Sequence, residues 1–392
     1  MCLHLRREVD VVVAGAGPGG LYAALEVLKR GLSVHVFDKK TVVGTPVKCG
    51  EYFPVRKEME SLLPSAGEYM SVFDIHKDAI DNTCKKLRVI SPAGTEFEFD
   101  FEAFILDRTV LEQGVAGEVE RLGGMIELGK PVDMFTQNDA ILVGPSKGEG
   151  VAAKVVIAAD GFPSQIAKTA GILTRDYMTP SNVAINYEYL MTNLSIDQSV
   201  TEMYMGTRFA PGGYGWIIPK GNDSANVGIG IRTSYSKRND GRSYLNFFLN
   251  ECPLSRGKLL GGLPGPMIAD VLPVDGPLPT TWAGQVIAVG DAAGMVMPTN
   301  GGGIATAMIS GRIAGQVAAD HLRNGTPVSD YERRWKAAMG KELRVSTKLR
   351  RLADHFMGND FVFNILLHVL RTDGIKDVIT CRAPKGLGLF IS

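Results

Sequence analysis

The chain has 392 residues, 45% of them hydrophobic and 21% charged, so it can bury a large core and is long enough for two domains. Lysine and arginine together number 42, as do aspartate and glutamate; this balance excludes a general attraction to nucleic acid, but not a local basic patch beside lipid headgroups. No stretch of about 18 uncharged apolar residues lacks a glycine interruption, so we expect no transmembrane helix, and any contact with a membrane must be peripheral.

The five cysteines are scattered and form no C-x-x-C pair. This pattern argues against a zinc site or a disulfide framework, so we expect no metal, and it favours a reducing cytoplasm as the location. The cysteines are Cys2, Cys49, Cys84, Cys252 and Cys381.

The first predicted elements are a strand, a glycine-rich turn, a helix and a second strand. Val9–Ala14 is a short apolar run rich in β-branched residues, which is typical of one buried parallel strand. Apolar residues at helical spacing follow as far as Gly31, where the helix ends, and Ser33–Phe37 is the second strand. This order of elements is typical of a unit that binds a dinucleotide, either NAD or FAD.

Gly15, Gly17 and Gly20 have the G-x-G-x-x-G spacing, and each has its own physical role. Gly15 lets the chain turn out of the strand, Gly17 leaves room for a pyrophosphate, and Gly20 lets the helix pack close to the strand. Asp38 lies 18 residues beyond Gly20, where a carboxylate can accept hydrogen bonds from a ribose. An ordinary glycine turn is the alternative.

A loop, a hairpin, a helix and a β-meander are predicted next. The loop at residues 47–54 reads VKCGEYFP and returns across the bound cofactor. The other predicted elements are strands at 86–90 and 95–101, a helix opened by Asp107 and Arg108, and strands at 125–128, 140–143 and 151–158.

A buried strand at residues 155–161 ends at Asp160, and a helix begins at Ser164. Because this strand would end at the same crevice as the first two, Asp160 is a candidate cofactor contact. The alternative is a strand end with an ordinary turn.

Residues 183–232 are rich in strand signals and predict a second, mostly antiparallel layer. This layer contains APGGYGWIIPK at 210–220 and NVGIG at 226–230. A helix at 243–249 follows, and the prolines at 264, 266, 273, 277 and 279 predict turns that lead the chain back.

Another buried strand ends at Gly290 and Asp291, and glycines that include Gly302 and Gly303 precede a long helix at Ile304–His321. The start of this helix predicts a second site for an anion or a carbonyl group. A carboxylate at Asp291 would reach the middle of an extended cofactor, which suits the ribityl hydroxyls of FAD better than any group of NAD; a helix cap is the alternative.

The chain ends with a basic helical segment at 329–356 and an apolar segment at 361–370, FVFNILLHVL. The apolar segment is either a buried core helix or a lid that touches lipid. The role of the chain beyond Gly358 stays open.

Three cofactor motifs, GAGPGG…FD, AADG and VGDAAG…GGG, occur in this order between Asp10 and His321. They resemble the FAD-binding fold of the p-hydroxybenzoate hydroxylase type. Within this fold, VKCGEYFP and APGGYGWIIPKG resemble the geranylgeranyl reductase family, which has a K/R-C-G-E loop and a P-x-x-Y-x-W-x-F-P segment. Ile218 stands where that family has phenylalanine, which leaves the exact isoprenoid open.

The resemblance implies an α/β fold with a Rossmann-like FAD-binding domain, a substrate domain built on a mostly antiparallel sheet, and a C-terminal helical region. The implied boundaries are 1–170 and 283–325 for the two parts of the FAD-binding domain, 171–282 for the substrate domain, and 326–392 for the helical region.

The resemblance also implies saturation of double bonds in isoprenoid chains of archaeal-type lipids, such as digeranylgeranylglycerophospholipid. The cofactor is FAD, and the electron donor is NAD(P)H or reduced ferredoxin, since no second complete G-x-G-x-x-G unit occurs. By position, the implied FAD contacts are Gly20, Asp38, Cys49, Gly50, Tyr52, Arg108, Val132, Asp291, Gly303 and Ile304.

Saturation of an alkene needs a hydride from reduced flavin and a proton on the neighbouring carbon. Cys49, with Glu51 near it, is the candidate proton donor or shield, although Cys49 could simply be a small residue that fits beside the flavin. Tyr214 and Trp216 are candidates for a flat apolar wall along a prenyl chain, together with Ile218; the alternative is that they are core aromatics.

Two rival functions stay open at this stage. A flavin monooxygenase or halogenase shares the fold, and GYGWIIP approaches the G-W-x-W-x-I-P signature of halogenases, with Tyr214 in place of the first tryptophan. The other rival is a non-catalytic flavoprotein that carries electrons or senses lipid.

Overall fold

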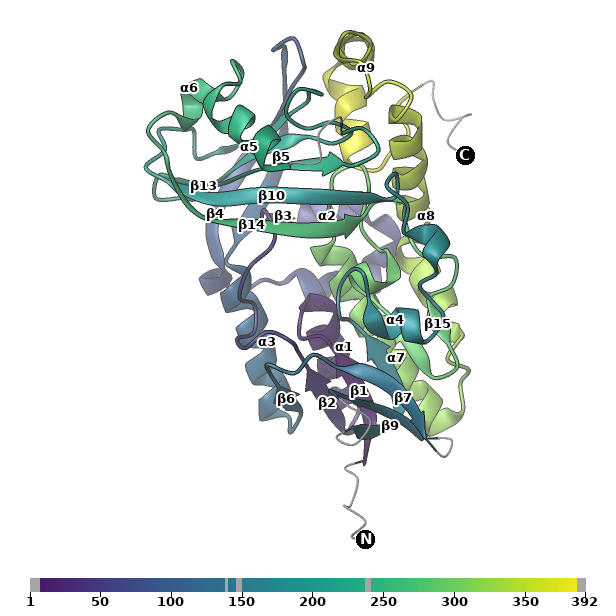
Figure 1. The fold of residues 1–392 in the computed structure, drawn as a ribbon. Helices are drawn as coiled ribbons and strands as arrows, with labels where there is room; N and C mark the ends of the chain where they lie inside the picture. Colours follow the sequence, from purple (N-terminus) through teal and green to yellow (C-terminus); the bar gives the residue numbers. More distant parts are fainter. Residues whose placement is uncertain (1–7, 138–139, 146–149, 237–240, 386–392) are drawn as a thin grey trace.

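The computed structural model describes residues 8–137, 140–145, 150–236 and 241–385. Two eight-stranded sheets lie toward opposite ends of the molecule, and the long helices α7 (Ile304–Asn324) and α8 (Asp330–Ala353) run alongside them (Figure 1). Cys2 of the sequence analysis lies outside the described residues.

The first sheet has the strand order β15-β16-β9-β1-β2-β6, and β7 and β8 attach to it through β9. β6, β2, β1, β9 and β16 are parallel, as expected for a Rossmann-like sheet. The strands are β1 (Glu8–Ala14), β2 (Val34–Phe37), β6 (Met125–Glu127), β7 (Asp133–Gln137), β8 (Ala140–Gly144), β9 (Val151–Ala158), β15 (Trp282–Ala283) and β16 (Val286–Ala288).

The strands β1 and β9 are buried because α1 (Pro18–Lys29) and α7 pack against each other and on these strands. Close helix packing needs glycine at two points. A Cβ at Gly311 would lie 2.0 Å from the Gly19 carbonyl oxygen, and a Cβ at Gly315 would lie 2.6 Å from that of Ala23. The two helices therefore touch backbone to backbone.

The second sheet has the order β14-β10-β13-β12-β11-β4-β5-β3. It is antiparallel except where β11 runs parallel to β4, which confirms the predicted, mostly antiparallel layer. The strands are β3 (Tyr52–Pro54), β4 (Ile80–Ile90), β5 (Glu96–Leu106), β10 (Val183–Thr192), β11 (Val200–Tyr204), β12 (Gly215–Gly221), β13 (Ser224–Arg232) and β14 (Leu263–Pro273).

The predicted proline-rich turns after residue 262 are wrong for three prolines. Pro264, Pro266 and Pro273 belong to β14, which is the edge strand of the second sheet and pairs with β10. An edge strand has one side without ladder partners, so it tolerates residues that lack an N–H group. Local turn signals cannot reveal this tolerance.

The domain boundaries inferred from the sequence stay a prediction. The strands β3, β4 and β5 pair within the second sheet, although residues 52–106 fall inside the predicted first part of the FAD-binding domain. A boundary at residue 170 therefore does not separate the two sheets.

The remaining elements are short helices that connect or cover the sheets. They are α2 (Arg56–Leu62), η1 (Pro64–Phe73), η2 (Lys77–Ala79), α3 (Arg108–Arg121), α4 (Gln165–Thr169), η3 (Arg175–Tyr177), α5 (Gly241–Asn250), α6 (Arg256–Leu259) and η4 (Gly290–Ala293). Among the described residues, no helix combines the length and the apolar character needed to cross a bilayer.

The helix α9 (Asp360–Ile379) contains the apolar segment for which the sequence left two alternatives open. Phe363 and Leu367 are buried, as in a core helix. Phe361 and Val369, in contrast, are 73% and 72% exposed. The helix is therefore apolar on its packed face and also on part of its exposed face.

Candidate active site

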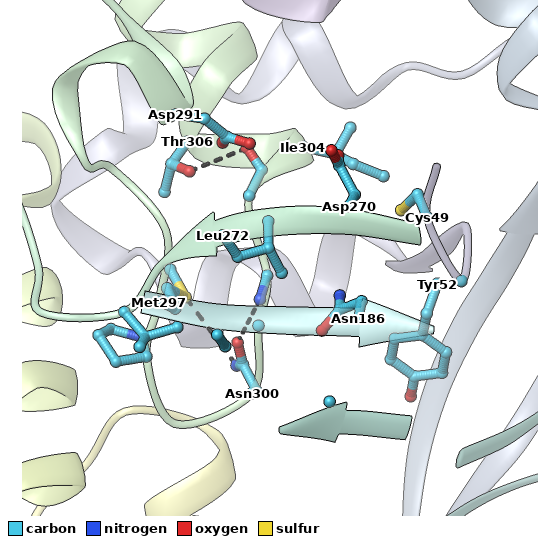
Figure 2. Close-up of a pocket in the computed structure, with 18 of the residues that line it drawn as sticks. Cys49, Tyr52, Asn186, Asp270, Leu272, Asp291, Met297, Asn300, Ile304 and Thr306 are labelled. Carbon is cyan, nitrogen blue, oxygen red and sulfur yellow. Dashed lines mark hydrogen bonds between the residues drawn. The ribbon is translucent and has the colours of Figure 1, made fainter. Parts of the chain in front are cut away.

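A cavity of about 1110 Å³ is lined by residues of both sheets and of α7, α8 and α9. This volume lies slightly above the usual range for small-molecule sites, roughly 300–1,000 Å³, so there is room for more than one ligand. Figure 2 shows part of the lining, with Cys49, Asn186, Asp270, Asp291 and Asn300 from distant parts of the chain.

The structure brings all but one of the sequence-predicted site residues to this cavity. Gly20 is the exception: it is buried, and a Cβ there would lie 1.9 Å from the Gly15 carbonyl oxygen. The lining residues are Gly15, Gly17, Asp38, Cys49, Gly50, Glu51, Tyr52, Arg108, Val132, Asp160, Tyr214, Trp216, Ile218, Gly290, Asp291, Gly302, Gly303 and Ile304.

The first glycine turn fits an anionic group. Gly15 has φ +111°, and a Cβ there would lie 2.1 Å from the Ala159 carbonyl oxygen, so only glycine suits this turn. Gly17 is the N-cap of α1, has no side chain to cap the helix, and has no atom within 4 Å of the place where a Cβ would lie. The helix N-terminus therefore faces open space that a pyrophosphate could fill.

A second helix N-terminus lies at the same cavity. Gly303 is the N-cap of α7, again without a side-chain cap and without an acidic residue in the first turn. The Asp291 carboxylate lies beside it, since Asp291 Oδ1 is 3.2 Å from the Cβ position of Gly303. Enclosure in the cavity, with a smaller contribution from the charge of Asp270, raises the pKa of Asp291 to about 6.

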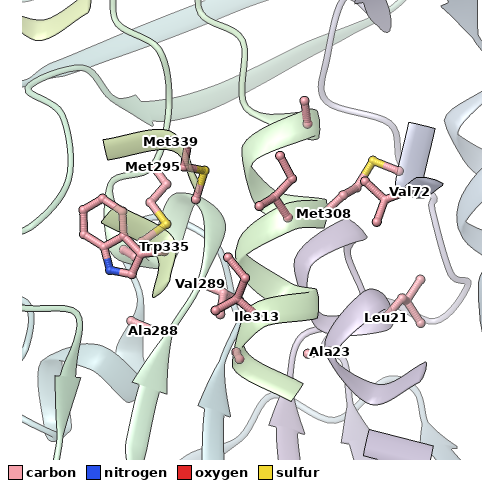
Figure 3. Close-up of a cluster of buried hydrophobic side chains, with 14 of the residues drawn as sticks. Leu21, Ala23, Val72, Ala288, Val289, Met295, Met308, Ile313, Trp335 and Met339 are labelled. Atoms are coloured by element: carbon pink, nitrogen blue, oxygen red, sulfur yellow. The ribbon is translucent and has the colours of Figure 1, made fainter. Parts of the chain in front are cut away.

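The position of Asp291 is set by the hydrophobic core behind it. Figure 3 shows Val289 beside Ile313 of α7, and Ala288 on the side of Trp335 and Met295, within one cluster of buried side chains. Gly290 then takes φ +55° and starts the short helix η4. The apolar strand therefore ends where the polar turn meets the cavity.

Two other predicted carboxylates accept hydrogen bonds from nearby parts of the chain. Asp38 accepts hydrogen bonds from the backbone N–H of Ala16, at 2.7 Å, and of Lys40, at 2.8 Å, and so ties the end of β2 to the glycine turn. Asp160 accepts from the hydroxyl of Ser164 and from the N–H of Gln165, and so caps α4. For Asp160 these contacts favour the alternative structural role.

The loop at residues 48–51 is fastened to the second sheet. Glu51 has the left-handed φ of +60°, and its buried carboxylate accepts hydrogen bonds from Lys220 Nζ and from Asn226 Nδ2, the latter at 3.1 Å. The Arg108 backbone N–H donates to the other oxygen at 3.0 Å. A carboxylate held by these donors acts as an acceptor, which suits a positioning role for Glu51 better than proton donation.

Cys49 lies in this loop beside the guanidinium of Arg108. Burial raises the pKa of the Cys49 thiol, and Arg108 opposes this effect without cancelling it. Arg108 itself bonds to the buried Glu112 carboxylate. The thiol of Cys49 is therefore protonated at neutral pH, and it can give a proton to a ligand in the cavity.

The residues of the predicted aromatic wall line the cavity, and they also pack in the core. The rings of Tyr214 and Trp216 lie 6.0 Å apart at 63°, and the Tyr214 hydroxyl donates to the Asn300 carbonyl oxygen at 2.7 Å. Trp216 and Ile218 are buried in a small cluster with Ile105. These side chains therefore pack inward and also line the cavity, and their contact with a prenyl chain stays a prediction.

Sequence reasoning missed several lining residues. Asn186 of β10 and Asp270 of β14 face each other across adjacent strands, and the expected proline turns concealed Asp270. The sequence analysis gave 361–370 two alternatives, a core helix or a lid, and assigned no cavity-lining residues to α8 or α9. This part of the chain supplies a large apolar part of the wall. The apolar lining residues there are Leu349, Leu352, Phe356, Met357, Phe363, Leu366, Leu367 and Leu370.

Comparison with known proteins agrees with this geometry. A model of the geranylgeranyl reductase catalytic domain matches residues 182–260, and a model of an FAD binding domain matches residues 10–50. The digeranylgeranylglycerophospholipid reductase 2 of Methanococcoides burtonii is 33% identical over 384 residues, covering 94% of this chain and 89% of that protein. The digeranylgeranylglycerophospholipid reductase of Methanosphaerula palustris is 32% identical over 406 residues, covering 98% and 95%.

Among solved structures, a geranylgeranyl bacteriochlorophyll reductase-like protein from Thermoplasma acidophilum has a TM-score of 0.82 and 24% identity, over 98% of each chain. A flavin-dependent brominase has a TM-score of 0.71 and 17% identity, over 98% of this chain and 97% of the other. At these identities the likeness shows the fold alone.

A parallel sheet with two uncapped helix N-termini at one cavity, together with the FAD binding domain match, defines an FAD-dependent oxidoreductase. The cofactor prediction of FAD is confirmed. Given its relatives and its catalytic-domain match, the chain belongs to the geranylgeranyl reductase family, as its K-C-G-E loop and aromatic segment predicted.

Proposed function

We propose that this protein saturates C=C double bonds in the geranylgeranyl chains of a membrane glycerophospholipid. The observation that carries the proposal is the continuity of the cavity: it runs from the glycine turn at Gly17 to the apolar wall of α8 and α9. A cofactor that binds at one end and an isoprenoid chain that enters from the other would meet near Cys49. The substrate class named for the archaeal relatives supports this choice.

In the proposed site, the glycine turn and the start of α7 would hold FAD. Bound and reduced, it supplies the hydride. The uncapped N-termini of α1 and α7 support this proposal, since a helix N-terminus favours phosphates and carbonyl oxygens. Its proposed contacts are Gly15, Gly17, Asp38, Cys49, Gly50, Tyr52, Arg108, Val132, Gly290, Asp291, Gly302, Gly303 and Ile304.

Cys49 gives the proton to the second alkene carbon, and Glu51 holds the loop that presents Cys49. Tyr214, Trp216 and Ile218 exclude water from the isoprenoid chain and keep it flat. The side chain at 218 affects which isoprenoid fits. The electron donor is NAD(P)H, which docks transiently, or reduced ferredoxin.

The protein is proposed to work in the cytoplasm as a peripheral membrane protein. The support comes from α9, whose inner face lines the cavity while its outer face stays apolar. An apolar helix face of this kind can enter the headgroup region of a bilayer. Its exposed apolar residues are Phe361, Val362, Ile365 and Val369.

The test is anaerobic. The FAD-loaded protein is reduced with dithionite, mixed with a geranylgeranyl glycerophospholipid, and the lipid is analysed by mass spectrometry. The proposal expects a gain of two hydrogens for each reduced bond. Lipid that binds without becoming saturated would refute the proposal, and so would a product that forms only with oxygen or that carries a halogen.

A further inference from the structure

Glu188 is a buried acid that the proposed function leaves unused. It lies on β10, two residues from Asn186 and four from Ala184, and both of these residues line the cavity. Since alternate residues of a strand face the same way, the Glu188 side chain points to the cavity side of the sheet. The residue is only 4% exposed.

Glu188 lies beside the aromatic wall, with a glycine between them. Gly228 of β13 pairs with Glu188 on one side and with Trp216 on the other. A Cβ at Gly228 would lie 2.4 Å from Trp216 Cζ2 and 2.7 Å from the Glu188 Cβ. The absent side chain therefore allows the indole and the carboxyl group to approach each other over the sheet.

The loop that carries Cys49 covers this part of the sheet. Lys48 Nζ lies 3.2 Å from Asp270 Oδ1 on β14, and Asn226 Nδ2 of β13 donates to the Gly50 carbonyl oxygen at 3.1 Å. The two anchor points lie on the strands that flank β10, where Asp270 pairs with Asn186 and Asn226 pairs with Leu190. Glu188 lies between these two positions of β10, and the Cys49 backbone N–H is close enough to lower the pKa of its carboxyl group. Glu188 therefore lies directly under the residue that we expect to protonate the alkene.

The second oxygen of Glu188 has no partner. Within the part of the chain that the structure describes, Glu188 Oε2 is buried and makes no hydrogen bond, whereas the buried carboxylates of Glu51 and Glu202 pair with lysine or arginine. A buried carboxyl group without a cation favours its neutral, proton-carrying form.

The charges that face Glu188 agree with this preference. Burial raises its pKa to about 7, and the negative charges of Glu51 and Asp270 add to this rise, while Arg108 opposes it. In turn, the Glu188 charge raises the pKa of the Cys49 thiol. The charge of Glu188 is thus close enough to the Cys49 thiol to affect its protonation.

We propose that Glu188 supplies the proton that restores the Cys49 thiol after Cys49 has protonated the substrate. This inference rests on the proposed function. Glu188 acts through Cys49 and does not touch the substrate, so it is a positioning residue that also holds a proton.

The S–H bond of Cys49 breaks as a C–H bond forms on one alkene carbon, while the other carbon takes the hydride, with both of its electrons, from reduced flavin. The O–H bond of Glu188 then breaks, the S–H bond re-forms, and Glu188 remains as a carboxylate. Water returns a proton to Glu188 before the next turnover.

The first experiment uses the protein without FAD. Iodoacetamide labelling of Cys49 is followed against pH by peptide mass spectrometry in the wild type and in Glu188→Gln. Removal of the neighbouring negative charge should lower the midpoint of Cys49 labelling by about one pH unit. The matched control is Glu342→Gln, because Glu342 is also buried, also has an unpartnered Oε2, and lies on α8 outside the cavity lining.

The second experiment uses the FAD-loaded protein with dithionite as reductant. The wild-type rate of lipid saturation should fall as the pH rises past about 7, where Glu188 loses its proton. Glu188→Gln should be roughly 10-fold slower at pH 6, because a positioned proton donor is lost. Its rate should not fall further as the pH rises past about 7. Glu188→Asp keeps an acid and should restore a pH-dependent rate.

The inference is overturned if Glu188→Gln matches the wild type both in the Cys49 labelling midpoint and in the pH profile. If Glu188→Gln does not fold, Glu188→Asp replaces it, and an unshifted pH profile overturns the inference. A wild type that saturates no lipid refutes the proposed function instead. The labelling midpoint then decides alone whether Glu188 controls the Cys49 thiol.

Discussion

Lys220 forms a buried ion pair with Glu51, and this contact joins β12 to a loop that precedes it by more than 160 residues in the chain. The two side chains are 14% and 5% exposed. Lys220 Nζ also donates to the Leu106 carbonyl oxygen at 2.7 Å and lies 2.9 Å from Asp81 Oδ2. The K-C-G-E loop is thus held in place by the second sheet.

Lys220→Met should destabilise the protein strongly. Removal of the ammonium leaves the Glu51 carboxylate buried without its cation, which costs about 3–5 kcal/mol. Urea unfolding of the FAD-free protein measures the loss. The control is Arg121→Met, whose ion pair with Glu118 is solvent-exposed and whose effect should stay within about 0.5 kcal/mol. Equal effects of the two variants would show that the Glu51 pair does not fix the loop.

Gly17→Ala should separate cofactor binding from folding. The added methyl group meets no atom within 4 Å, and φ at residue 17 is −83°, so the free energy of unfolding without FAD should not fall. The methyl group would fill the space proposed for the pyrophosphate, so the Kd for FAD should rise at least tenfold, or about 1.4 kcal/mol. Fluorescence titration with FAD measures this.

The matched control for Gly17→Ala is Gly114→Ala, because a Cβ at Gly114 also meets nothing within 4 Å and this glycine lies within α3, outside the cavity lining. Its FAD affinity should equal that of the wild type. Wild-type affinity in Gly17→Ala would place the cofactor elsewhere.

Gly228→Ala should disturb the aromatic wall. Its Cβ would collide with Trp216 and with the Glu188 side chain, and overpacking of this kind typically costs about 1–3 kcal/mol. Because the clash forces a shift beside the indole, which lines the cavity, saturation of a full-length prenyl chain should slow more than binding of FAD weakens. Gly257→Ala in α6 has free space and serves as the control. Unchanged turnover in Gly228→Ala would exclude Trp216 from the substrate wall.

The double variant Phe361→Ser, Val369→Ser should bind lipid vesicles less well. Both side chains are more than 70% exposed on α9, and full burial of one large apolar side chain contributes about 1.5–3 kcal/mol, so the affinity should fall at least tenfold. Vesicle sedimentation measures binding, and saturation of a detergent-dispersed prenyl lipid should persist. Val110→Ser removes an exposed apolar side chain of α3 and should change neither result. Wild-type vesicle binding by the double variant would exclude α9 as the membrane contact.

Part of this fold and site could be read directly from residue order. The βαβ unit follows from β-branched residues, glycine spacing and a helical stripe, all within residues 9–38, and the structure places β1, α1 and β2 there. The start of α7 after Gly303 was likewise visible, since glycines before an apolar helix form a local signal. These features depend on neighbours in the chain, so the sequence by itself determined them.

The tertiary structure decided the rest. Glu188 and Asn226 meet residues 49–51 only because β10 and β13 pair beneath that loop, and no local pattern records contacts between residues so far apart in the chain. Pro264 and Pro266 could belong to a strand only because that strand lies at an edge of the sheet. The physical reason is the same in each case: local propensities depend on residues within a few positions, whereas burial and pairing depend on what the whole chain brings together.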